Sequence, residues 1–342
     1  MEWNCIMGNL HFCFHGAGGL GSLIGGFLAR DGHKVTLIGR GSHVDAINAS
    51  GLLIEGVRAN FVTGIHQAVT FPDQIDDREI DYYVLCTKSK GSAQALSDAA
   101  CIRDRVKTAV SIQNGVGKEV RLIEAFGEDK VIGGSIMDGA TLLEPGKVLN
   151  HMKVPVTAYF GELNGGQSDR TRAIAEAFDH AGLGCRSVDD IQHVLWEKVF
   201  QVGTASTWSA STLAGVPSLD FADGLLVREG AEHFVQISKE MISIYRAMGF
   251  TPQNFFAPVS QLKELDQSDF EDAVEAAMAM GKRFLNGKRP VRTSMHEDLI
   301  SGRSMEVDEI LGSIYEQAKK HKVSAPTFIG AYRILKTLNA NL

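Results

Sequence analysis

The sequence has little that would suit a nucleic-acid or membrane partner. Its 34 lysines and arginines are outnumbered by 41 aspartates and glutamates, which gives a formal net charge of -7 at pH 7. A nucleic-acid-binding protein needs a basic face, and a peripheral membrane protein is favoured by a basic surface. No run approaches the roughly 18 consecutive apolar residues that cross a bilayer. We therefore expect neither partner.

Cysteine is scarce, with five residues and no CxxC pair, so we expect no disulfide framework and no metal site. The cysteines are Cys5, Cys13, Cys86, Cys101 and Cys185. Cys13 and Cys86 lie in apolar runs and are expected to fill the core. Residues 1–16 lack the basic start and the small-residue cleavage site that are typical of a signal peptide. A reduced, cytoplasmic protein is the expectation.

The composition is that of a globular protein, with 44% hydrophobic and 22% charged residues in a chain of 342. This length predicts about two domains. In the first part, short β-rich runs alternate with helical stretches, which is typical of an α/β domain with a parallel sheet of the Rossmann type. Strands are expected over residues 10–15, 34–38, 82–87, 108–112 and 131–133, helices over 20–31, 92–100 and 168–181, and a small β addition over 147–161.

After about residue 190 the pattern becomes helical, with no convincing strand. Pro252 and Pro326 lie at positions suited to the first turn of a helix. We place the boundary near Asp189, which gives a dinucleotide-binding domain over residues 1–189 and an all-helical substrate and catalytic domain over 190–342. The expected helices cover residues 192–202, 224–248, 252–263, 268–285, 305–321 and 326–338.

A glycine-rich motif of the form GxGxxG follows the first expected strand and precedes the first expected helix. In a dinucleotide-binding turn the first glycine allows the tight bend, the second lets a pyrophosphate approach the backbone, and the third lets helix and strand pack closely. The alternative is a glycine-rich turn that binds no ligand. The motif comprises Gly16, Ala17, Gly18, Gly19, Leu20 and Gly21.

The second expected strand leads to Arg40. An NAD-binding domain would carry an acidic residue near this point to accept a hydrogen bond from the ribose 2′-hydroxyl. A guanidinium suits a 2′-phosphate instead, since it can donate two parallel hydrogen bonds to phosphate oxygens. The sequence therefore favours NADP(H) over NAD(H). The alternative is an arginine that merely faces solvent in a loop.

These residues and four further stretches resemble the ketopantoate reductases, also called 2-dehydropantoate 2-reductases, over nearly the whole chain. The glycine motif is common to Rossmann domains, whereas the QNGVG stretch and the C-terminal stretch are much more specific. The matching stretches are GAGGLG at 16–21, Gly39-Arg40, Cys86-Thr87-Lys88, QNGVG at 113–117, Trp196-x-Lys198, and TSMHED at 293–298 with GR at 302–303 and EVD at 306–308.

The resemblance implies NADPH-dependent reduction of ketopantoate to pantoate, a step of pantothenate biosynthesis, and it assigns roles to five residues. Lys198 matches the catalytic lysine of the family. Asn114 matches an asparagine that contacts both cofactor and substrate, and Lys88 a lysine near the nicotinamide end. Ser294 matches a contact of the substrate carboxylate, and Glu306 a residue that holds the nicotinamide ribose.

Lys198 makes chemical sense on local grounds as well. On a helix its neighbours one turn away are Val194, Leu195 and Val202, so it lies on an apolar stripe, where lysine is unusual. Burial would lower the pKa of its ammonium group and make it a better proton donor. An ammonium group would also stabilise the negative charge that forms on a carbonyl oxygen under hydride attack. The alternative is a lysine that covers apolar surface while its charge stays in water.

The other assignments have plainer alternatives. Lys88 follows an expected strand at its carboxyl end, where ligands bind in open α/β sheets, but Lys90 is close and the segment could be a charged loop. Asn114 precedes a glycine, which is also a turn signal. Glu306 could be an acidic residue at a helix start, and Ser294 a cap or turn residue.

The chain departs from the family at the positions that recognise the substrate. Where the family carries two asparagines, one and two turns after the catalytic lysine, this chain has Val202 and Ser206, and a third asparagine falls near Val216. Because lost hydrogen bonds to a substrate hydroxyl weaken its selection severely, we expect a small 2-oxo acid or related carbonyl that is more apolar than ketopantoate.

Three rival readings stay open. The chain could be a true ketopantoate reductase with a remodelled pocket, a non-catalytic NADP-binding or redox-sensing protein, or an imine or amino-acid dehydrogenase. The presence of Lys198 counts against a non-catalytic protein. The sequence does not fix the oligomeric state and leaves a homodimer open.

Overall fold

The protein is described here by a computed structural model over residues 9–213, 216–287 and 290–342. Contacts divide the chain into two compact units. The first unit holds the residues up to 113 and residues 117–195, and the second holds residues 114–116 and 196–342. Cys5 lies outside the described residues.

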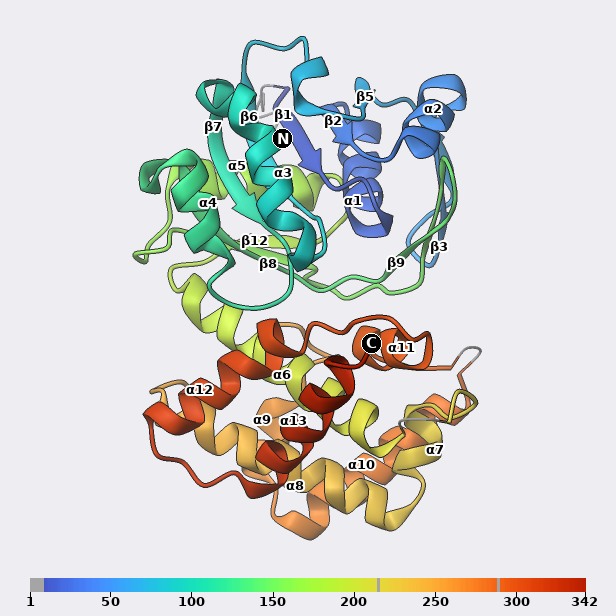
Figure 1. Cartoon of the computed structure of the whole chain (residues 1–342), viewed down its shortest axis with the longest axis vertical. Helices are drawn as coiled ribbons and strands as arrows, with labels where there is room; N and C mark the ends of the chain where they lie inside the picture. Colours follow the sequence, from blue (N-terminus) through green and yellow to red (C-terminus); the bar gives the residue numbers. More distant parts are fainter. Residues whose placement is uncertain (1–8, 214–215, 288–289) are drawn as a thin grey trace, which may run out of the picture. The chain divides into compact units, whose positions relative to one another are not determined.

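The first unit is built on an eight-stranded sheet with the order β12-β11-β8-β7-β6-β1-β2-β5 (Figure 1). The run from β5 to β8 is parallel throughout, and β11 pairs antiparallel to β8. Parallel pairing of this kind needs helical crossovers, which the alternating sequence pattern supplies. The strands are β1 (His11–His15), β2 (Lys34–Ile38), β5 (Gln67–Val69), β6 (Ile80–Leu85), β7 (Val106–Ser111), β8 (Val131–Ile136), β11 (Ala158–Gly161) and β12 (Cys185–Ser187).

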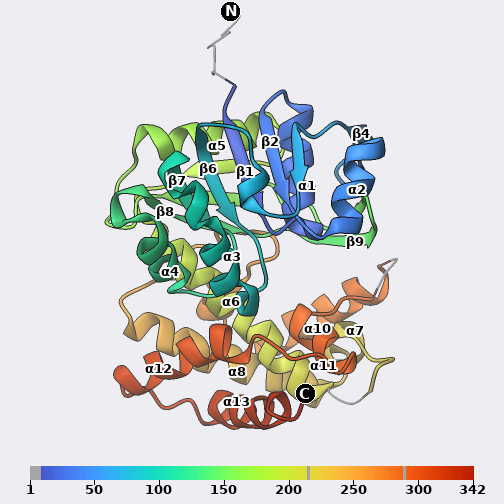
Figure 2. The same ribbon diagram turned by 45° about the horizontal axis from the view of Figure 1, so that its top comes forward.

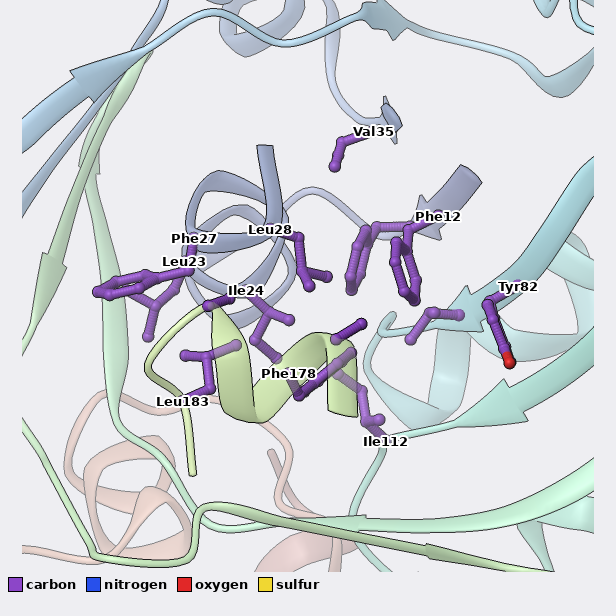
Figure 3. Close-up of a cluster of buried hydrophobic side chains, with 14 of the residues drawn as sticks. Phe12, Leu23, Ile24, Phe27, Leu28, Val35, Tyr82, Ile112, Phe178 and Leu183 are labelled. Atoms are coloured by element: carbon purple, nitrogen blue, oxygen red, sulfur yellow. The ribbon is translucent and has the colours of Figure 1, made fainter. Parts of the chain in front are cut away.

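Both faces of this sheet are buried, and successive side chains of a strand therefore enter two different cores. Phe12 of β1 belongs to the core under α1 (Gly19–Arg30) and α5 (Asp169–His180), whereas Cys13 belongs to the core under α3 (Ser92–Asp98) and α4 (Lys118–Phe126). Figure 3 shows Ile24 and Leu28 of α1 pointing toward Phe12 and toward Phe178 of α5. This fold therefore requires strands that can be buried on both faces, and the polar side chains of β1, His11 and His15, are hydrogen-bonded.

A second, four-stranded sheet has the order β4-β3-β10-β9 and contacts α1. Its approach depends on Gly26, where a Cβ atom would come within 2.3 Å of the Ile54 side chain. The strands are β3 (Leu52–Gly56), β4 (Phe61–Thr63), β9 (Ala140–Glu144) and β10 (Lys147–Asn150), and α2 (Gly41–Ser50) precedes β3. Short 3₁₀ turns complete the unit at Pro72–Gln74, Ser89–Gly91, Ala99–Arg105 and Glu128–Lys130.

The second unit is helical and has its own core. Trp208 of α6 (Ile191–Thr212) is fully buried, and its indole N–H donates to the Gly230 carbonyl oxygen at 2.8 Å. The Glu240 carboxylate accepts hydrogen bonds from the backbone N–H groups of Thr327 and Phe328, at 3.2 and 2.9 Å, in the first turn of the last helix. The remaining helices are α7 (Phe221–Leu225), α8 (Arg228–Ala247), α9 (Leu262–Gln267), α10 (Phe270–Leu285), α11 (Ser294–Ile300), a π-helical turn η5 (Asp308–Gly312), α12 (Ser313–Lys320) and α13 (Pro326–Asn339).

The expected fold class is confirmed, and several element boundaries are corrected. The helix expected over 252–263 is wrong: α9 begins at Leu262, and Asn254 before it has a φ of 59°. The cause is the buried Glu197 carboxylate, which accepts the N–H groups of Gln253 and Phe255 at 2.6 and 2.8 Å. These N–H groups therefore bind a side chain and not a helical carbonyl oxygen.

Three further boundaries differ from expectation. The helix expected over 224–248 is two helices, α7 and α8, because Val227 between them is extended. The β addition expected over 147–161 is divided, with β10 in the small sheet and β11 in the large one. Strand β6 ends at Leu85, so Cys86 and Thr87 already belong to the loop, and Cys86 is only half-buried. Among the described helices, none is both long and apolar enough to span a membrane.

Candidate active site

The strand order of the first unit creates a switch point between β1 and β6. To one side the chain continues through β2 and β5, and to the other through β7 and β8. In open α/β sheets, ligands bind outside the carboxyl ends of the strands at such a point. The glycine motif follows β1 directly, and Lys88 comes three residues after the end of β6. Two predicted cofactor segments therefore leave adjacent strands at the same edge.

The glycine motif has the geometry that a dinucleotide turn requires. Gly16 has a φ of +114°, and a Cβ there would lie 2.6 Å from the Thr87 nitrogen. At Gly21 a Cβ would lie 2.5 Å from the Gly16 carbonyl oxygen. Gly18, between them, would meet no atom within 4 Å. The first and third glycines are thus required by packing, while the second leaves open space where a pyrophosphate could approach.

The other three residues of the motif hold the turn in place. Ala17 is buried, and its N–H donates to the Ile38 carbonyl oxygen at 2.8 Å. Gly19 begins α1 beside β9, since a Cβ there would lie 2.4 Å from the Ala140 carbonyl oxygen. Leu20 packs against the core. The turn is therefore fixed between β2 and the small sheet.

Arg40 lies two residues after β2, at the N-cap of α2, and is exposed. The strand is the neighbour of β1, so the guanidinium group leaves the sheet at the same edge as the glycine motif. That is the position where a Rossmann domain contacts the cofactor ribose. No acidic residue lies between β2 and Arg40. The donor set therefore fits a 2′-phosphate.

Gln113 connects the loops after β6 and β7 and was not singled out from the sequence. Its side-chain amide donates to the Thr87 carbonyl oxygen at 2.6 Å and to the Ser92 hydroxyl at 2.7 Å. Lys118 donates to the Gln113 carbonyl oxygen and to that of Gly134, each at 2.8 Å. Burial lowers the pKa of the Lys118 ammonium to about 8. Gln113, which precedes Asn114, is therefore fixed through both its side chain and its backbone. In the sequence, the QNGVG motif was the signal that pointed to Gln113.

Lys198 and Asn114 meet within the second unit. The Lys198 Nζ donates to the Asn114 side-chain oxygen at 3.0 Å, and the lysine is 6% exposed. Because this oxygen accepts from an ammonium group, the Asn114 amide nitrogen points elsewhere as a donor. Two residues that are 84 positions apart, and were predicted separately, thus form one polar pair.

The loop that carries Asn114 also contacts the segment after Glu306. Gly115 has a φ of +92°, and a Cβ there would lie 2.9 Å from the Glu309 carbonyl oxygen. The Glu306 carbonyl oxygen accepts the Ile310 N–H at 3.2 Å, at the start of η5. Glu306 is half-buried and precedes that turn rather than lying within it. The EVD stretch and the QNGVG stretch are therefore neighbours in space.

Val202 and Ser206 lie on the same face of α6 as Lys198, at helical spacing. Val202 is half-buried, and Ser206 is fully buried with no hydrogen-bond partner for its hydroxyl oxygen among the described residues. The side-chain oxygen of Gln201, one turn after Lys198, is likewise buried and unpartnered within the described part of the chain. Gln201 was not predicted as a site residue, because the family resemblance points only to the next position, Val202.

Ser294 is the exposed first residue of α11. Its neighbour Thr293, and not Ser294, caps that helix, by accepting the His296 N–H at 3.2 Å. The Thr293 hydroxyl also pairs with the Ser209 hydroxyl of α6 at 2.9 Å. Ser209 is eleven residues after Lys198 (about 16 Å of helical rise). Thr293, which precedes Ser294, is thus bonded to α6 three turns beyond the lysine.

Histidine and cysteine alternate along β1 at His11, Cys13 and His15, a spacing that the expectation of no metal site overlooked. His11 pairs with the Glu79 carbonyl oxygen and the Thr36 hydroxyl, and His15 with the Tyr83 hydroxyl at 2.8 Å. Burial lowers the pKa of His15 to about 4 and raises that of Cys13. No group of three metal-binding side chains occurs in the described part of the chain.

Comparison with known proteins gives consistent matches over both units. The family model "ketopantoate reductase PanE/ApbA" matches residues 12–165, and the model of the C-terminal part of the same family matches residues 190–339. A 2-dehydropantoate 2-reductase of Pyrococcus horikoshii is 30% identical over 91% of each chain. The crystal structure of 2-dehydropantoate 2-reductase from Methylococcus capsulatus has a TM-score of 0.76 at 24% identity, covering 97% of each chain.

A second similar solved structure is of an enzyme with a different named activity from the 2-dehydropantoate 2-reductases. It is a D-mandelate dehydrogenase in a ternary complex with NADH and anilino(oxo)acetate. It has a TM-score of 0.74 at 19% identity and covers 97% of this chain and 99% of its own. At this identity the likeness concerns the fold alone.

Proposed function

The chain belongs to the ketopantoate reductase family, a family of oxidoreductases, and from this premise we propose that it reduces the carbonyl group of a small 2-oxo acid with NADPH. The observation that carries the proposal is the hydrogen bond of 3.0 Å between Lys198 and Asn114. It places a buried cation and an amide side by side on a helix and a loop that the family motifs also single out. Each has a part in stabilising a developing alkoxide.

When bound, NADPH supplies the hydride that reduces the carbonyl carbon. The chain supplies the rest. The Lys198 ammonium group donates a hydrogen bond to the carbonyl oxygen, stabilises the negative charge that forms there, and delivers the proton that completes the hydroxyl group. The Asn114 oxygen keeps the ammonium group oriented, and its amide nitrogen remains a donor for cofactor or substrate. The family resemblance alone assigns Ser294 to the carboxylate of the substrate, because its neighbour Thr293 is bonded to α6 three turns beyond Lys198. The resemblance likewise assigns Glu306 and Lys88 to the nicotinamide end of the cofactor.

The preference for NADPH over NADH rests on Arg40 and the glycine motif. Gly18 leaves the backbone open to a pyrophosphate, and exposed Arg40 follows the strand next to β1, after which a Rossmann domain contacts the cofactor ribose. The D-mandelate dehydrogenase structure holds NADH, so members of this fold use both cofactors. An arginine in place of an acidic residue is what favours the phosphorylated form here.

The proposed substrate carries an apolar substituent beside its carbonyl group. Val202 lies one helical turn after Lys198, at the position where, by the resemblance, the family has an asparagine. The loss of this hydrogen-bonding side chain favours a 2-oxo acid with an apolar group over ketopantoate.

The test is NADPH oxidation by the purified protein across a panel of 2-oxo acids that includes ketopantoate and aryl- and alkyl-substituted acids. Lys198→Ala serves as the control. We expect turnover with an apolar acid, lost in the variant. Strong turnover of ketopantoate would show that the protein is a true ketopantoate reductase with a remodelled pocket. Tight NADPH binding without any turnover would favour a binding protein, and turnover that requires ammonia or an amine would favour an imine or amino-acid dehydrogenase.

A further inference from the structure

His43 lies in the first turn of α2, three residues after Arg40, and is 2% exposed. Both of its ring nitrogens have partners from other elements. Nε2 lies 3.0 Å from the Ser22 hydroxyl oxygen on α1, and Nδ1 lies 2.9 Å from the Gly146 nitrogen in the turn between β9 and β10. Figures 1 and 2 show α2 beside the end of β9. A single imidazole thus joins three elements of the first unit.

The partners determine the tautomer of this ring. A backbone N–H can only donate, so Nδ1 accepts from Gly146 and carries no proton. Nε2 then carries the proton and donates it to the Ser22 hydroxyl oxygen. The ring is neutral with both nitrogens satisfied, and burial lowers its pKa in agreement with this form. The turn at Gly146 packs closely on α2, since a Cβ there would lie 3.1 Å from the Cβ of Ala46.

These bonds connect the two phosphate-binding segments that we propose for the cofactor. The His43 N–H donates to the Arg40 carbonyl oxygen at 3.0 Å, so His43 closes the turn that presents the guanidinium group. Ser22 belongs to the first turn of α1, and its N–H donates to the Gly18 carbonyl oxygen at 3.0 Å. The backbone bonds from Gly16 and Ala17 to the Ile38 carbonyl oxygen join the glycine motif to the end of β2. The bridge from His43 to Ser22 is a second connection, which joins the first turn of α2 to the first turn of α1.

We infer that His43 is a positioning residue for the 2′-phosphate of the cofactor, because it holds the start of α2, where Arg40 lies, at its distance from the start of α1. The inference rests on the proposed use of NADP(H). A cofactor gripped at its pyrophosphate can reach the guanidinium group with its 2′-phosphate only if that distance is correct. NADH has no 2′-phosphate, so its binding depends much less on the bridge. The preference for NADPH over NADH is then a property of His43 as well as of Arg40.

The test measures the dissociation constants of NADPH and NADH for the full-length protein without substrate, by the fluorescence of the bound dinucleotide. For His43→Leu we expect the NADPH constant to rise about tenfold and the NADH constant to stay within about twofold. His43→Asn keeps an acceptor for Gly146 and loses only the contact with Ser22, so it should lose part of the preference. Ser22→Ala removes the same contact by deleting the hydroxyl group, and it should lose as much of the NADPH preference as His43→Asn.

Two controls separate positioning from general stability. His11 is also a buried histidine with both ring nitrogens bonded, but at the opposite end of β1 from the glycine motif. His11→Leu should lower the melting temperature and leave the NADPH to NADH ratio unchanged. In a double-mutant cycle, Arg40→Met should abolish the preference, and adding His43→Leu should change the ratio no further, since both act on one contact.

The outcomes distinguish the inference from its premise. A wild-type protein that binds NADH as tightly as NADPH overturns the proposed cofactor and the inference with it. A wild-type preference that survives unchanged in His43→Leu, or additive losses in the cycle, overturns the inference alone. If His43→Leu does not fold, the decision passes to His43→Asn and Ser22→Ala, and an unchanged ratio in both overturns it equally.

Discussion

Replacing Asn114 tests the pair that it forms with Lys198. The Asn114 oxygen accepts a hydrogen bond from a buried ammonium group at 3.0 Å, and hydrogen bonds to charged groups contribute about 1.5–3 kcal/mol. If the bond is needed to orient the proton donor, Asn114→Ala should lower kcat/KM by about 10- to 150-fold. The loss should be in turnover more than in NADPH binding, because Lys198 acts on the carbonyl oxygen.

Asn114→Asp gives a sharper result, because it replaces a neutral acceptor with a carboxylate of the same size. An anion at this distance favours the charged form of the lysine and raises the pKa of Lys198 above its wild-type value. The more tightly held proton is a weaker acid, so turnover at neutral pH should fall. The alkaline limb of the profile of kcat/KM against pH, where the ammonium group loses its proton, should move to higher pH.

The assay is NADPH oxidation at saturating and limiting substrate from pH 6 to pH 10, with the NADPH dissociation constant measured separately. Asn60→Asp is the matched control: it adds the same charge at an exposed turn of the first unit and should leave the profile in place. An alkaline limb at the same pH in Asn114→Asp and wild type, together with activity within about twofold in Asn114→Ala, would refute the proposed acid.

Three other changes test the fold and the two binding regions. Arg58→Met removes the partner of buried Asp138, 2.9 Å away, and should cost about 3–5 kcal/mol of unfolding free energy. Burial raises the pKa of Asp138 even with Arg58 present, so an ionised Asp138 without Arg58 is unfavourable, and protonation at low pH relieves this cost. Denaturant titration should therefore show a smaller loss of unfolding free energy in Arg58→Met at pH 5 than at pH 8. An equal loss at the two pH values would contradict this. Gly18→Ala should leave the melting temperature nearly unchanged, since a Cβ there meets nothing within 4 Å, but should weaken NADPH binding at least about tenfold. Unweakened binding would exclude the pyrophosphate site. Val202→Asn should raise kcat/KM for ketopantoate at least about tenfold and lower it for apolar acids, and the absence of any change in this ratio would remove Val202 from substrate selection.

The sequence predicted the elements whose patterns are local. The strands β1 and β2 and the helices α1 and α13 lie within one residue of expectation, since alternating or helical spacing and Pro326 mark them directly. The elements that were missed depend on distant partners. The small sheet packs against α1 where Gly26 leaves room for the Ile54 side chain, and the loop before α9 is shaped by the Glu197 carboxylate, 56 residues before Gln253.

The site shows the same division. The sequence singles out the glycine motif and Arg40 as candidates because each lies in a short stretch that follows a strand, and their cofactor roles stay predictions. The family resemblance singled out Lys198 and Asn114 separately, but not their pairing, and no local pattern relates two residues 84 positions apart. Gln113, Gln201 and the His43–Ser22 bridge could not be found from spacing, because their significance is a contact or an unpartnered atom in the folded chain.

The central claim is that hydride passes from NADPH to the carbonyl carbon of a 2-oxo acid while Lys198 supplies the proton. Its most direct test is turnover of a 2-oxo acid with NADPH deuterated at C4 of the nicotinamide, followed by mass spectrometry of the product. We predict one deuterium at C2 of the resulting 2-hydroxy acid with one stereoisomer of the labelled cofactor, formed at least about 100-fold more slowly by Lys198→Ala. A product without deuterium from either isomer, or an unchanged rate in the variant, would contradict the account.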